Sequence, residues 1–112
     1  MRTTVMGKLL FAAFGVALST LGPALAATKT VDIHNFRYAP NPIRIHVGDR
    51  ITFVNRDDEP HTVTAVDKTF DSQGLDTSGR WSHVFARAGT FVYFCELHPY
   101  MKATIVVLPL KK

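Results

Sequence analysis

The sequence contains only one cysteine, Cys95, among its 112 residues. A single cysteine cannot form a disulfide within its own chain, so the disulfide framework that many small exported domains use is excluded. A lone thiol in such a domain is protected by burial, paired with another chain, or bonded to a metal. Cys95 is therefore a candidate functional residue, with a buried and inert core thiol as the simplest alternative.

Methionine is almost as scarce as cysteine. Met1 and Met6 lie in the first residues of the chain, and Met101 is the only methionine beyond them. The five histidines form no His-x-His pair and no His-Cys-His run. Multicopper oxidases and nitrite reductases need further copper ligands of that kind, and a binuclear copper site needs a second cysteine. We therefore do not expect an enzyme with several copper ions.

Charge of one sign is not concentrated anywhere in the chain. The 13 Lys and Arg residues outnumber the 9 Asp and Glu residues, which gives a formal net charge of +4. Arg2 and Lys8 lie near the N-terminus, and the other basic residues are interspersed with acidic ones. Because a nucleic-acid-binding domain would show a basic run or stripe, we expect no nucleic-acid partner.

The first residues have the pattern of a secretory signal peptide. A basic start precedes an apolar stretch over residues 9–21, and Ala-Leu-Ala at 24–26 supplies the small residues after which signal peptidase cleaves. The apolar stretch is shorter than the roughly 20 residues that a membrane-spanning helix needs. A retained membrane anchor is the alternative. We predict a cleaved signal over residues 1–26 and one domain over residues 27–112, in the periplasm and without stable membrane insertion.

Apolar residues in the predicted domain alternate with a period of two, and no sustained helical period is present. Residues 43–47 read Ile, Arg, Ile, His, Val, which is typical of a half-buried strand. Gly48-Asp49 then has the composition of a two-residue hairpin turn, with residues 51–54 as the returning strand. The pattern therefore favours sheet structure from the start of the domain.

Seven segments of this kind follow one another with turn residues between them. They cover residues 30–36, 43–47, 51–54, 61–66, 81–85, 90–95 and 102–108. Short strands at regular spacing predict an all-β antiparallel sandwich or barrel, with about seven or eight strands. Residues 91–94 and 105–108 are apolar on both faces, so we expect these two strands at the centre of a sheet, with both faces covered.

The segment after the strand at 90–95 combines three residues that bind metals. It reads Cys95-x2-His98-x2-Met101, so a thiolate, an imidazole and a thioether lie close together in the sequence. His61 supplies a second imidazole directly after Pro60, at the start of another predicted strand. In a β-sandwich the two loops can meet at one end of the molecule. The four side chains could then point at one centre.

Two imidazoles, one thiolate and a weakly bound thioether form the ligand set of a copper ion that cycles between Cu(I) and Cu(II). A structural zinc site would more often use further Cys or His in place of methionine. Each residue alone has a structural explanation, because buried cysteine, gap-filling methionine and core histidine are common. The joint spacing nevertheless favours one copper ion bound by His61, Cys95, His98 and Met101.

The remaining histidines have weaker patterns. His34 and His46 lie on predicted strands, opposite or outside the apolar face, and are expected to face solvent. His83 lies on the same face of its predicted strand as Trp81 and Phe85, so it is either buried or a competing ligand. We favour a structural role for all three.

These motifs resemble the cupredoxin family of blue-copper proteins, most closely its amicyanin and pseudoazurin branch. The resemblance extends from about Val31 to Leu108. The residues that carry it are Gly48-Asp49, Pro60-His61-Thr62-Val63, Ala88-Gly89-Thr90-Phe91, Tyr93 and Cys95-x2-His98-Pro99-x-Met101. The compact loop between the last three ligands is most similar to that of amicyanin.

The resemblance implies a Greek-key antiparallel β-sandwich with copper near one end. His98 would be the ligand nearest the surface, where the electron leaves. An apolar collar of Pro60, Leu97, Pro99 and Tyr100 would surround it and suit brief docking.

One residue departs from the family pattern. Members commonly carry Asn directly after the first histidine ligand, where it links the two ligand loops and places hydrogen bonds near the cysteine sulfur. This sequence has Thr62 at that position. A hydroxyl can replace the amide only in part, so the surroundings of the sulfur and the redox potential are expected to differ.

The resemblance also implies a function. The chain would be a periplasmic carrier that shuttles single electrons between a redox enzyme donor and a cytochrome or oxidase acceptor, and would not itself be an enzyme. Redox protein partners would include an amine dehydrogenase-type donor and a c-type cytochrome acceptor, and we expect a monomer. A periplasmic copper carrier or store is the alternative, although a single methionine and a closed ligand set argue against it. A structural β-domain without metal is a further alternative and would stay colourless with copper.

Overall fold

The computed structural model describes residues 25–110 as eight strands joined by loops. The strands are β1 (Thr28–His34), β2 (Arg37–Ala39), β3 (Ile43–His46), β4 (Arg50–Asn55), β5 (Thr64–Ala65), β6 (Arg80–Val84), β7 (Gly89–Cys95) and β8 (His98–Leu108). The signal peptide predicted over residues 1–26 lies almost wholly outside the described residues. Within residues 25–110, no helix is long and apolar enough to cross a membrane.

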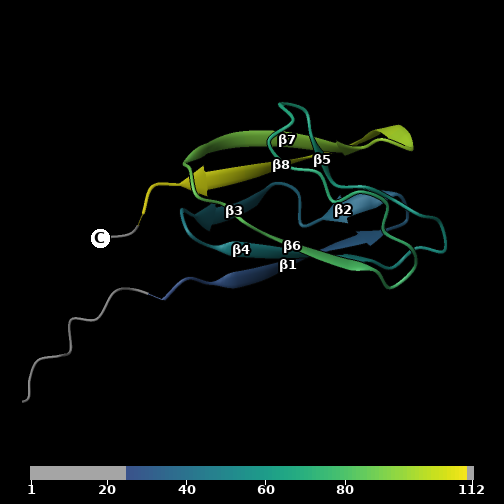
Figure 1. Cartoon of the computed structure of the whole chain (residues 1–112), viewed down its shortest axis with the longest axis horizontal. Helices are drawn as coiled ribbons and strands as arrows, with labels where there is room; N and C mark the ends of the chain where they lie inside the picture. Colours follow the sequence, from purple (N-terminus) through teal and green to yellow (C-terminus); the bar gives the residue numbers. More distant parts are fainter. Residues whose placement is uncertain (1–24, 111–112) are drawn as a thin grey trace, which may run out of the picture.

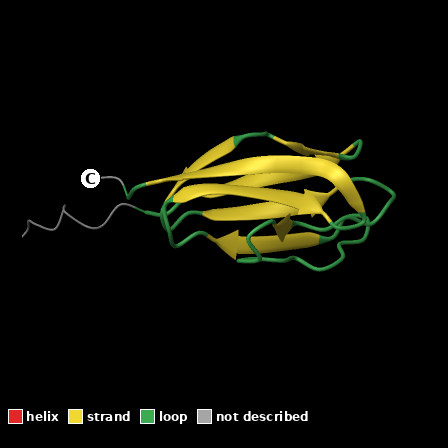
Figure 2. Cartoon of the chain, turned by 90° about the horizontal axis from the view of Figure 1, so that it is seen from above, coloured by secondary structure: helices red, strands yellow, loops and turns green. Residues whose placement is uncertain are grey.

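The strands form two four-stranded sheets that face each other as a sandwich (Figures 1 and 2). Sheet A has the order β2-β1-β4-β6, and sheet B has the order β3-β8-β7-β5. This confirms the predicted all-β sandwich of about eight strands. The sheets are mixed, because β1 with β4 and β3 with β8 are parallel pairs, whereas the other pairs are antiparallel.

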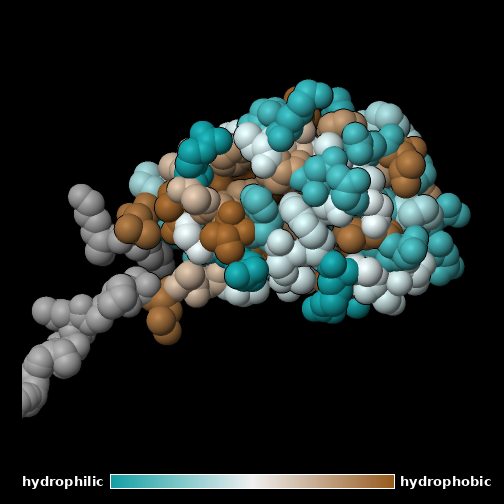
Figure 3. All heavy atoms as spheres, viewed as in Figure 1, coloured by the Kyte–Doolittle hydropathy of each residue, from teal (hydrophilic) through white to brown (hydrophobic). Residues whose placement is uncertain are grey.

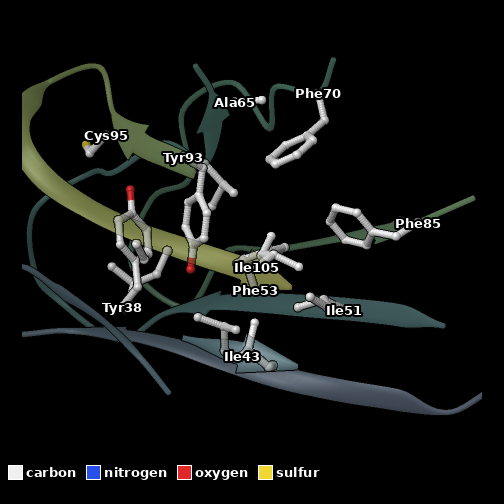
Figure 4. Close-up of a cluster of buried hydrophobic side chains, with 14 of the residues drawn as sticks. Tyr38, Ile43, Ile51, Phe53, Ala65, Phe70, Phe85, Tyr93, Cys95 and Ile105 are labelled. Carbon is white, nitrogen blue, oxygen red and sulfur yellow. The ribbon is translucent and has the colours of Figure 1, made fainter. Parts of the chain in front are cut away.

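The core lies between the two sheets, and most strands contribute alternate residues to it. On β4, Ile51 and Phe53 point inward and are fully buried, while Thr52 between them is partly exposed. On β8, Ala103 and Ile105 are buried in the same way. Figure 4 shows buried side chains from both sheets converging on this space. The period-two pattern of the sequence therefore identifies the buried face of strands such as β3 and β8.

The turn at Gly48 does not form the predicted hairpin. It leads from β3, which pairs with β8 in sheet B, to β4, which pairs with β1 and β6 in sheet A. Gly48 has a φ angle of 95°, which glycine adopts without a steric penalty. The Asp49 carboxylate accepts the backbone N–H groups of His46 and Ala27, each at 2.8 Å. The hairpin prediction was wrong because Gly-Asp indicates a sharp turn but not the sheet in which the next strand pairs.

The strand predicted over residues 30–36 is interrupted by a turn. β1 ends at His34, and β2 pairs back on it in antiparallel register, with Arg37 opposite His34. The two residues between them, Asn35 and Phe36, have positive φ angles of 53° and 59°. Two-residue turns of this kind usually carry glycine. Because no glycine is present, the sequence gives no local indication of the turn.

The two strands expected at the centre of a sheet do lie there, but only one face of each is covered. β7 lies between β5 and β8, and β8 lies between β3 and β7. On the outer face, Val92 is 41% exposed, and Phe94 and Val106 are partly exposed. A two-layer sandwich covers only the inner faces of its sheets, so the expectation of two covered faces was wrong.

Figure 3 shows hydrophobic and hydrophilic side chains interspersed on the surface in view.

Tyr93 on β7 is fully buried, and its hydroxyl has no hydrogen-bond partner among the described residues. Its ring packs against Tyr38 and Phe53, with centroids 4.6 and 5.6 Å away. Burial raises the pKa of the phenol, so the hydroxyl stays protonated. An unsatisfied buried polar group costs about 1–3 kcal/mol. We therefore expect Tyr93→Phe to raise the free energy of unfolding of the metal-free protein by about 1 kcal/mol in urea denaturation.

Tyr38 provides the matched control for this substitution. Its hydroxyl is also buried but donates to the backbone carbonyl of Thr62 at 2.6 Å. Tyr38→Phe removes that hydrogen bond and should therefore lower the free energy of unfolding. A loss of stability in Tyr93→Phe comparable to that in Tyr38→Phe would contradict the prediction.

Candidate metal centre

The donor atoms of His61, Cys95 and His98 all lie within 4.8 Å of one another. The Nδ1 atom of His61 is 3.7 Å from the Sγ atom of Cys95, and the Nδ1 atom of His98 is 3.6 Å from it. Both imidazoles therefore turn the same ring nitrogen toward the thiol. Three of the four residues proposed from sequence spacing thus meet at one point.

Two segments of the fold bring these residues together. Cys95 and His98 are paired at the end of the β7–β8 hairpin, with only Glu96 and Leu97 between them. His61 lies in the loop between β4 and β5 and forms an isolated bridge with Leu75, in which each backbone N–H donates to the other's carbonyl at 3.1 and 2.8 Å. The β7–β8 turn lies at the end of the sandwich opposite to the start of β1 and the end of β8 (Figure 1).

The four proposed ligands differ in their exposure to solvent. His61 and Cys95 are fully buried, and Met101 is 2% exposed on the inward face of β8. His98 is only partly buried. It is therefore the most accessible of the four, in agreement with the expectation from the family resemblance.

Asp57 holds the His61 ring from the side that faces away from the thiol. Its Oδ2 atom is 2.8 Å from Nε2 of His61. Burial raises the pKa of this carboxyl, but the backbone N–H groups of Phe36 and Asn35 and the His61 ring outweigh it and hold the pKa below its ordinary value. An ionised carboxylate on the outer nitrogen fixes the tautomer and orientation of an imidazole. The Nδ1 lone pair of His61 is thereby left free for a metal.

Thr62 links the two ligand segments. Its backbone N–H donates to the Sγ atom of Cys95 at 3.3 Å, and its Oγ1 atom accepts the backbone N–H of Glu96 at 2.8 Å. The hydroxyl also lies 2.8 Å from the hydroxyl of Thr64. The threonine that departs from the family pattern therefore still makes a side-chain hydrogen bond between the two loops.

We expect Thr62→Val to weaken this link without changing the shape of the side chain much. Valine cannot accept the N–H of Glu96, and a partly buried donor without a partner costs about 1–3 kcal/mol. The backbone hydrogen bond to Cys95 is unaffected. Urea denaturation should therefore show a loss of about 1 kcal/mol in the metal-free protein. Thr62→Ser retains the hydroxyl and is the control; equal losses in both variants would contradict a role for the hydroxyl.

The other histidines lie outside the cluster. His34 is exposed, and its Nδ1 atom is 3.5 Å from the Oδ1 atom of Asp57. His83 stacks on Trp81 with ring centroids 5.3 Å apart and an interplanar angle of 17°, and burial lowers its pKa. His46 lies at the end of β3 and is partly exposed. None of the three joins the cluster formed within residues 25–110.

The sequence patterns did not predict three residues around the centre: Asp57, Phe36 and Tyr38. An acidic residue four positions before a candidate histidine ligand could have pointed to Asp57. Phe36 and Tyr38 reach the centre only because the β1–β2 hairpin folds over it, and no local pattern marks them.

The donor set fits a soft transition metal. A thiolate with two imidazoles suits copper or zinc, whereas hard cations such as Mg²⁺ and Ca²⁺ prefer carboxylate and carbonyl oxygens. The nearby carboxylate of Asp57 is directed at the outer nitrogen of His61 and is not part of the donor cluster. A buried thioether on the adjacent strand favours copper over zinc. Within residues 25–110, the fold and the donors define a class: a small β-sandwich with a cluster of one thiol and two imidazoles at one end.

The chain matches the sequence model of the Cupredoxin-like domain over residues 8–107. It therefore belongs to the cupredoxin-like family, as its motifs implied. Amicyanin of Paracoccus denitrificans is 33% identical over 82 residues, which cover 69% of this chain and 63% of that protein. Amicyanin-alpha of Methylorubrum extorquens is 30% identical over 96 residues, which cover 81% of each. The chain thus spans less than two thirds of the first of these relatives.

A further relative and two solved structures extend the comparison. Methylamine utilization protein MauL of Methylophilus methylotrophus is 34% identical over 94 residues, which cover 80% of this chain and 53% of that protein. An oxidized mutant of amicyanin superimposes with a TM-score of 0.68 at 30% identity, covering 71% of this chain and 81% of that one. A purple cupredoxin from Nitrosopumilus maritimus gives a TM-score of 0.68 at 29% identity, covering 70% and 98%.

Proposed function

We propose that this chain is an electron carrier that holds one copper ion with His61, Cys95, His98 and Met101. The proposal is carried by one observation, the cluster in which the Nδ1 atoms of His61 and His98 lie 3.7 and 3.6 Å from the Cys95 thiol. Membership of the cupredoxin-like family supports it. The burial of Met101 directly after this cluster supports its role as the fourth donor.

Bound copper would supply a Cu(I)/Cu(II) couple that accepts and releases single electrons. The residues of the chain hold the donors in place for it. Asp57 fixes His61, the backbone N–H of Thr62 donates to the Cys95 sulfur, and the β7–β8 ladder sets the spacing between Cys95 and His98. Donors that are held by such contacts rearrange little when the charge changes. Little rearrangement means a small barrier to electron transfer.

The surface around His98 supports its role as the electron exit. Leu97 and Tyr100 are 54% and 72% exposed, and Pro60 and Pro99 are also exposed. An exposed apolar group of this kind suits a partner that docks briefly and leaves quickly. The collar predicted from the sequence therefore supports short-lived redox encounters at this end of the sandwich.

We further propose that the protein acts as a monomer in the periplasm after removal of residues 1–26. The amicyanin relatives, together with the methylamine utilization protein MauL, support redox partners in amine oxidation. A dehydrogenase-type donor and a c-type cytochrome acceptor would meet the collar around His98 in turn.

A visible absorption spectrum of the purified, copper-loaded protein tests the proposal. We expect an intense blue thiolate-to-copper band in the oxidised protein, which disappears on reduction and returns on reoxidation. A colourless copper-loaded protein would show that the cluster is not a type 1 centre. Slow exchange of bound copper with a chelator is expected of an electron carrier, whereas rapid exchange would favour a copper carrier or store.

A further inference from the structure

The turn between β1 and β2 places a bulky residue in a backbone conformation that favours glycine. Asn35 and Phe36 have φ angles of 53° and 59°. Asparagine tolerates this left-handed region, but a large aromatic residue there is a strained outlier. Strained residues persist only where surrounding contacts hold them, and they cluster at functional sites. The turn alone therefore does not explain why a phenylalanine occupies position 36.

Asp57 holds this strained turn. Its Oδ1 atom accepts the backbone N–H of Asn35 at 2.7 Å, and its Oδ2 atom accepts that of Phe36 at 2.9 Å. The same Oδ2 atom lies 2.8 Å from Nε2 of His61. One carboxylate thus ties the turn directly to one of the proposed copper ligands.

The Phe36 ring packs against both imidazoles of the centre. Its centroid is 5.0 Å from that of His61 at an interplanar angle of 88°, and 4.8 Å from that of His98 at 85°. The centroids of the two imidazoles are 5.0 Å apart. The three rings therefore form a triangle of nearly equal sides. Edge-to-face contacts at this distance are favourable and depend on ring orientation.

His98 needs such support more than His61 does. Within residues 25–110, the only hydrogen-bonding contact of the His98 ring is the one to the Cys95 Sγ atom at 3.6 Å. In the same part of the chain no carboxylate lies within hydrogen-bonding distance of its outer nitrogen, and the ring is partly exposed. Its orientation therefore depends on packing, and the Tyr100 ring is more distant, with centroids 6.3 Å apart. Besides the His61 imidazole at 5.0 Å, Phe36 supplies the close ring contact, with centroids 4.8 Å apart.

We propose that Phe36 is a positioning residue of the metal centre, whose ring is directed by the Asp57-bound turn against both imidazoles and keeps His98 oriented toward Cys95. The inference rests on the proposed function, because it takes His98 to be a metal ligand. It explains why the chain retains a strained phenylalanine where glycine would fit the turn better. The strain in the backbone is the cost of placing an aromatic ring at this point.

Three variants separate the effect of the aromatic ring of Phe36 from the effect of the backbone strain in the turn. Phe36→Tyr keeps an aromatic ring, Phe36→Leu keeps only an apolar side chain, and Phe36→Gly also relieves the backbone strain. Dissociation of Zn²⁺ into a chelator measures how firmly the centre holds a metal that has no redox chemistry. We expect dissociation about 10- to 100-fold faster in the Leu and Gly variants, as for other residues that orient metal ligands. The Tyr variant should stay close to the unchanged protein.

Two further measurements distinguish positioning from a merely structural role. Urea denaturation of the metal-free proteins should show Phe36→Gly at least as stable as Phe36→Leu, because glycine relieves the strain. Weaker metal retention would then not follow from a weaker fold. Nuclear magnetic resonance of the His98 ring in the metal-free proteins should show one orientation in the unchanged and Tyr proteins, and averaging in the Leu and Gly variants.

Failure of this inference differs from failure of the proposed function. Unchanged Zn²⁺ dissociation and an unchanged His98 ring in Phe36→Leu and Phe36→Gly would overturn the role of Phe36, even if the protein were blue with copper. Equal loosening in Phe36→Tyr would overturn it as well. If the unchanged protein bound neither copper nor Zn²⁺, the proposed function would fail, while the resonance of the His98 ring would still decide whether Phe36 orients it.

Discussion

Replacing Cys95 with serine is expected to abolish the blue absorption of the copper-loaded protein. The thiolate is the origin of the charge-transfer band and the only anionic sulfur donor among the proposed ligands. A serine hydroxyl is not ionised in this buried position and gives no such band. Visible spectra and copper content, recorded side by side for both proteins, measure the effect.

His83→Gln is the matched control for Cys95→Ser. It removes a histidine that stacks on Trp81 outside the metal cluster. The blue band should therefore remain at full intensity in this variant. Circular dichroism should show the same β-structure in all three proteins. A blue band that survives in Cys95→Ser would mean that the thiol is a core residue and that copper binds elsewhere.

Truncation of Phe53 to alanine should cause the largest loss of stability. Phe53 is fully buried on β4, and its ring packs against Trp81 and Tyr93 with centroids 5.7 and 5.6 Å away. Phe→Ala substitutions in a core cost about 3–5 kcal/mol through lost burial and the cavity left behind. Small domains have only about 5–15 kcal/mol of stability in total. The variant should therefore be close to unfolding, or partly unfolded, at ordinary temperature.

Urea denaturation of the metal-free protein measures this loss, because bound metal would add its own stabilisation. Val66→Ala is the control, since Val66 is 57% exposed and its truncation should change stability by less than about 0.5 kcal/mol. Phe53→Leu fills most of the space and should fall between the two. A Phe53→Ala variant as stable as Val66→Ala would mean that the two sheets do not pack on this residue.

Local patterns in the sequence predict seven of the eight described strands, but they miss β2, make β5 too long at residues 61–66, and predict strand partners poorly. Period-two alternation identifies β3, β4 and β6 because side chains on a strand point alternately to the two faces. Alternation cannot say which strand pairs with which. The turn at Gly48 therefore looks like a hairpin although it connects the two sheets. The parallel pairing of β1 with β4 and of β3 with β8 joins residues far apart in the sequence, and no local signal encodes it.

The proposed ligands could be found from the sequence because three of them, like the residues of a single strand, form a local pattern. Cys95, His98 and Met101 have a characteristic spacing on one short segment, which a linear sequence displays directly. The residues that orient them do not share a segment. Asp57 lies in a polar loop and Phe36 in a turn without glycine, and they reach the centre only after the sheets have packed. Tertiary structure is needed to find what supports a site, even where the ligands themselves can be read from their spacing.

The position of β8 inside sheet B determines when that sheet can be completed during folding. It is the last strand of the described chain, yet it lies inside sheet B between β3 and β7, and it begins at His98 and contains Met101. A chain that emerges from its N-terminus onward cannot complete sheet B until this strand is available, and such long-range pairings form slowly. Until then the Cys95 thiol lacks two of its three proposed companions and the cover of the folded core. An exposed thiol is more open to oxidation than a buried one, so the interval before β8 docks is when the proposed centre is most vulnerable to oxidation of Cys95.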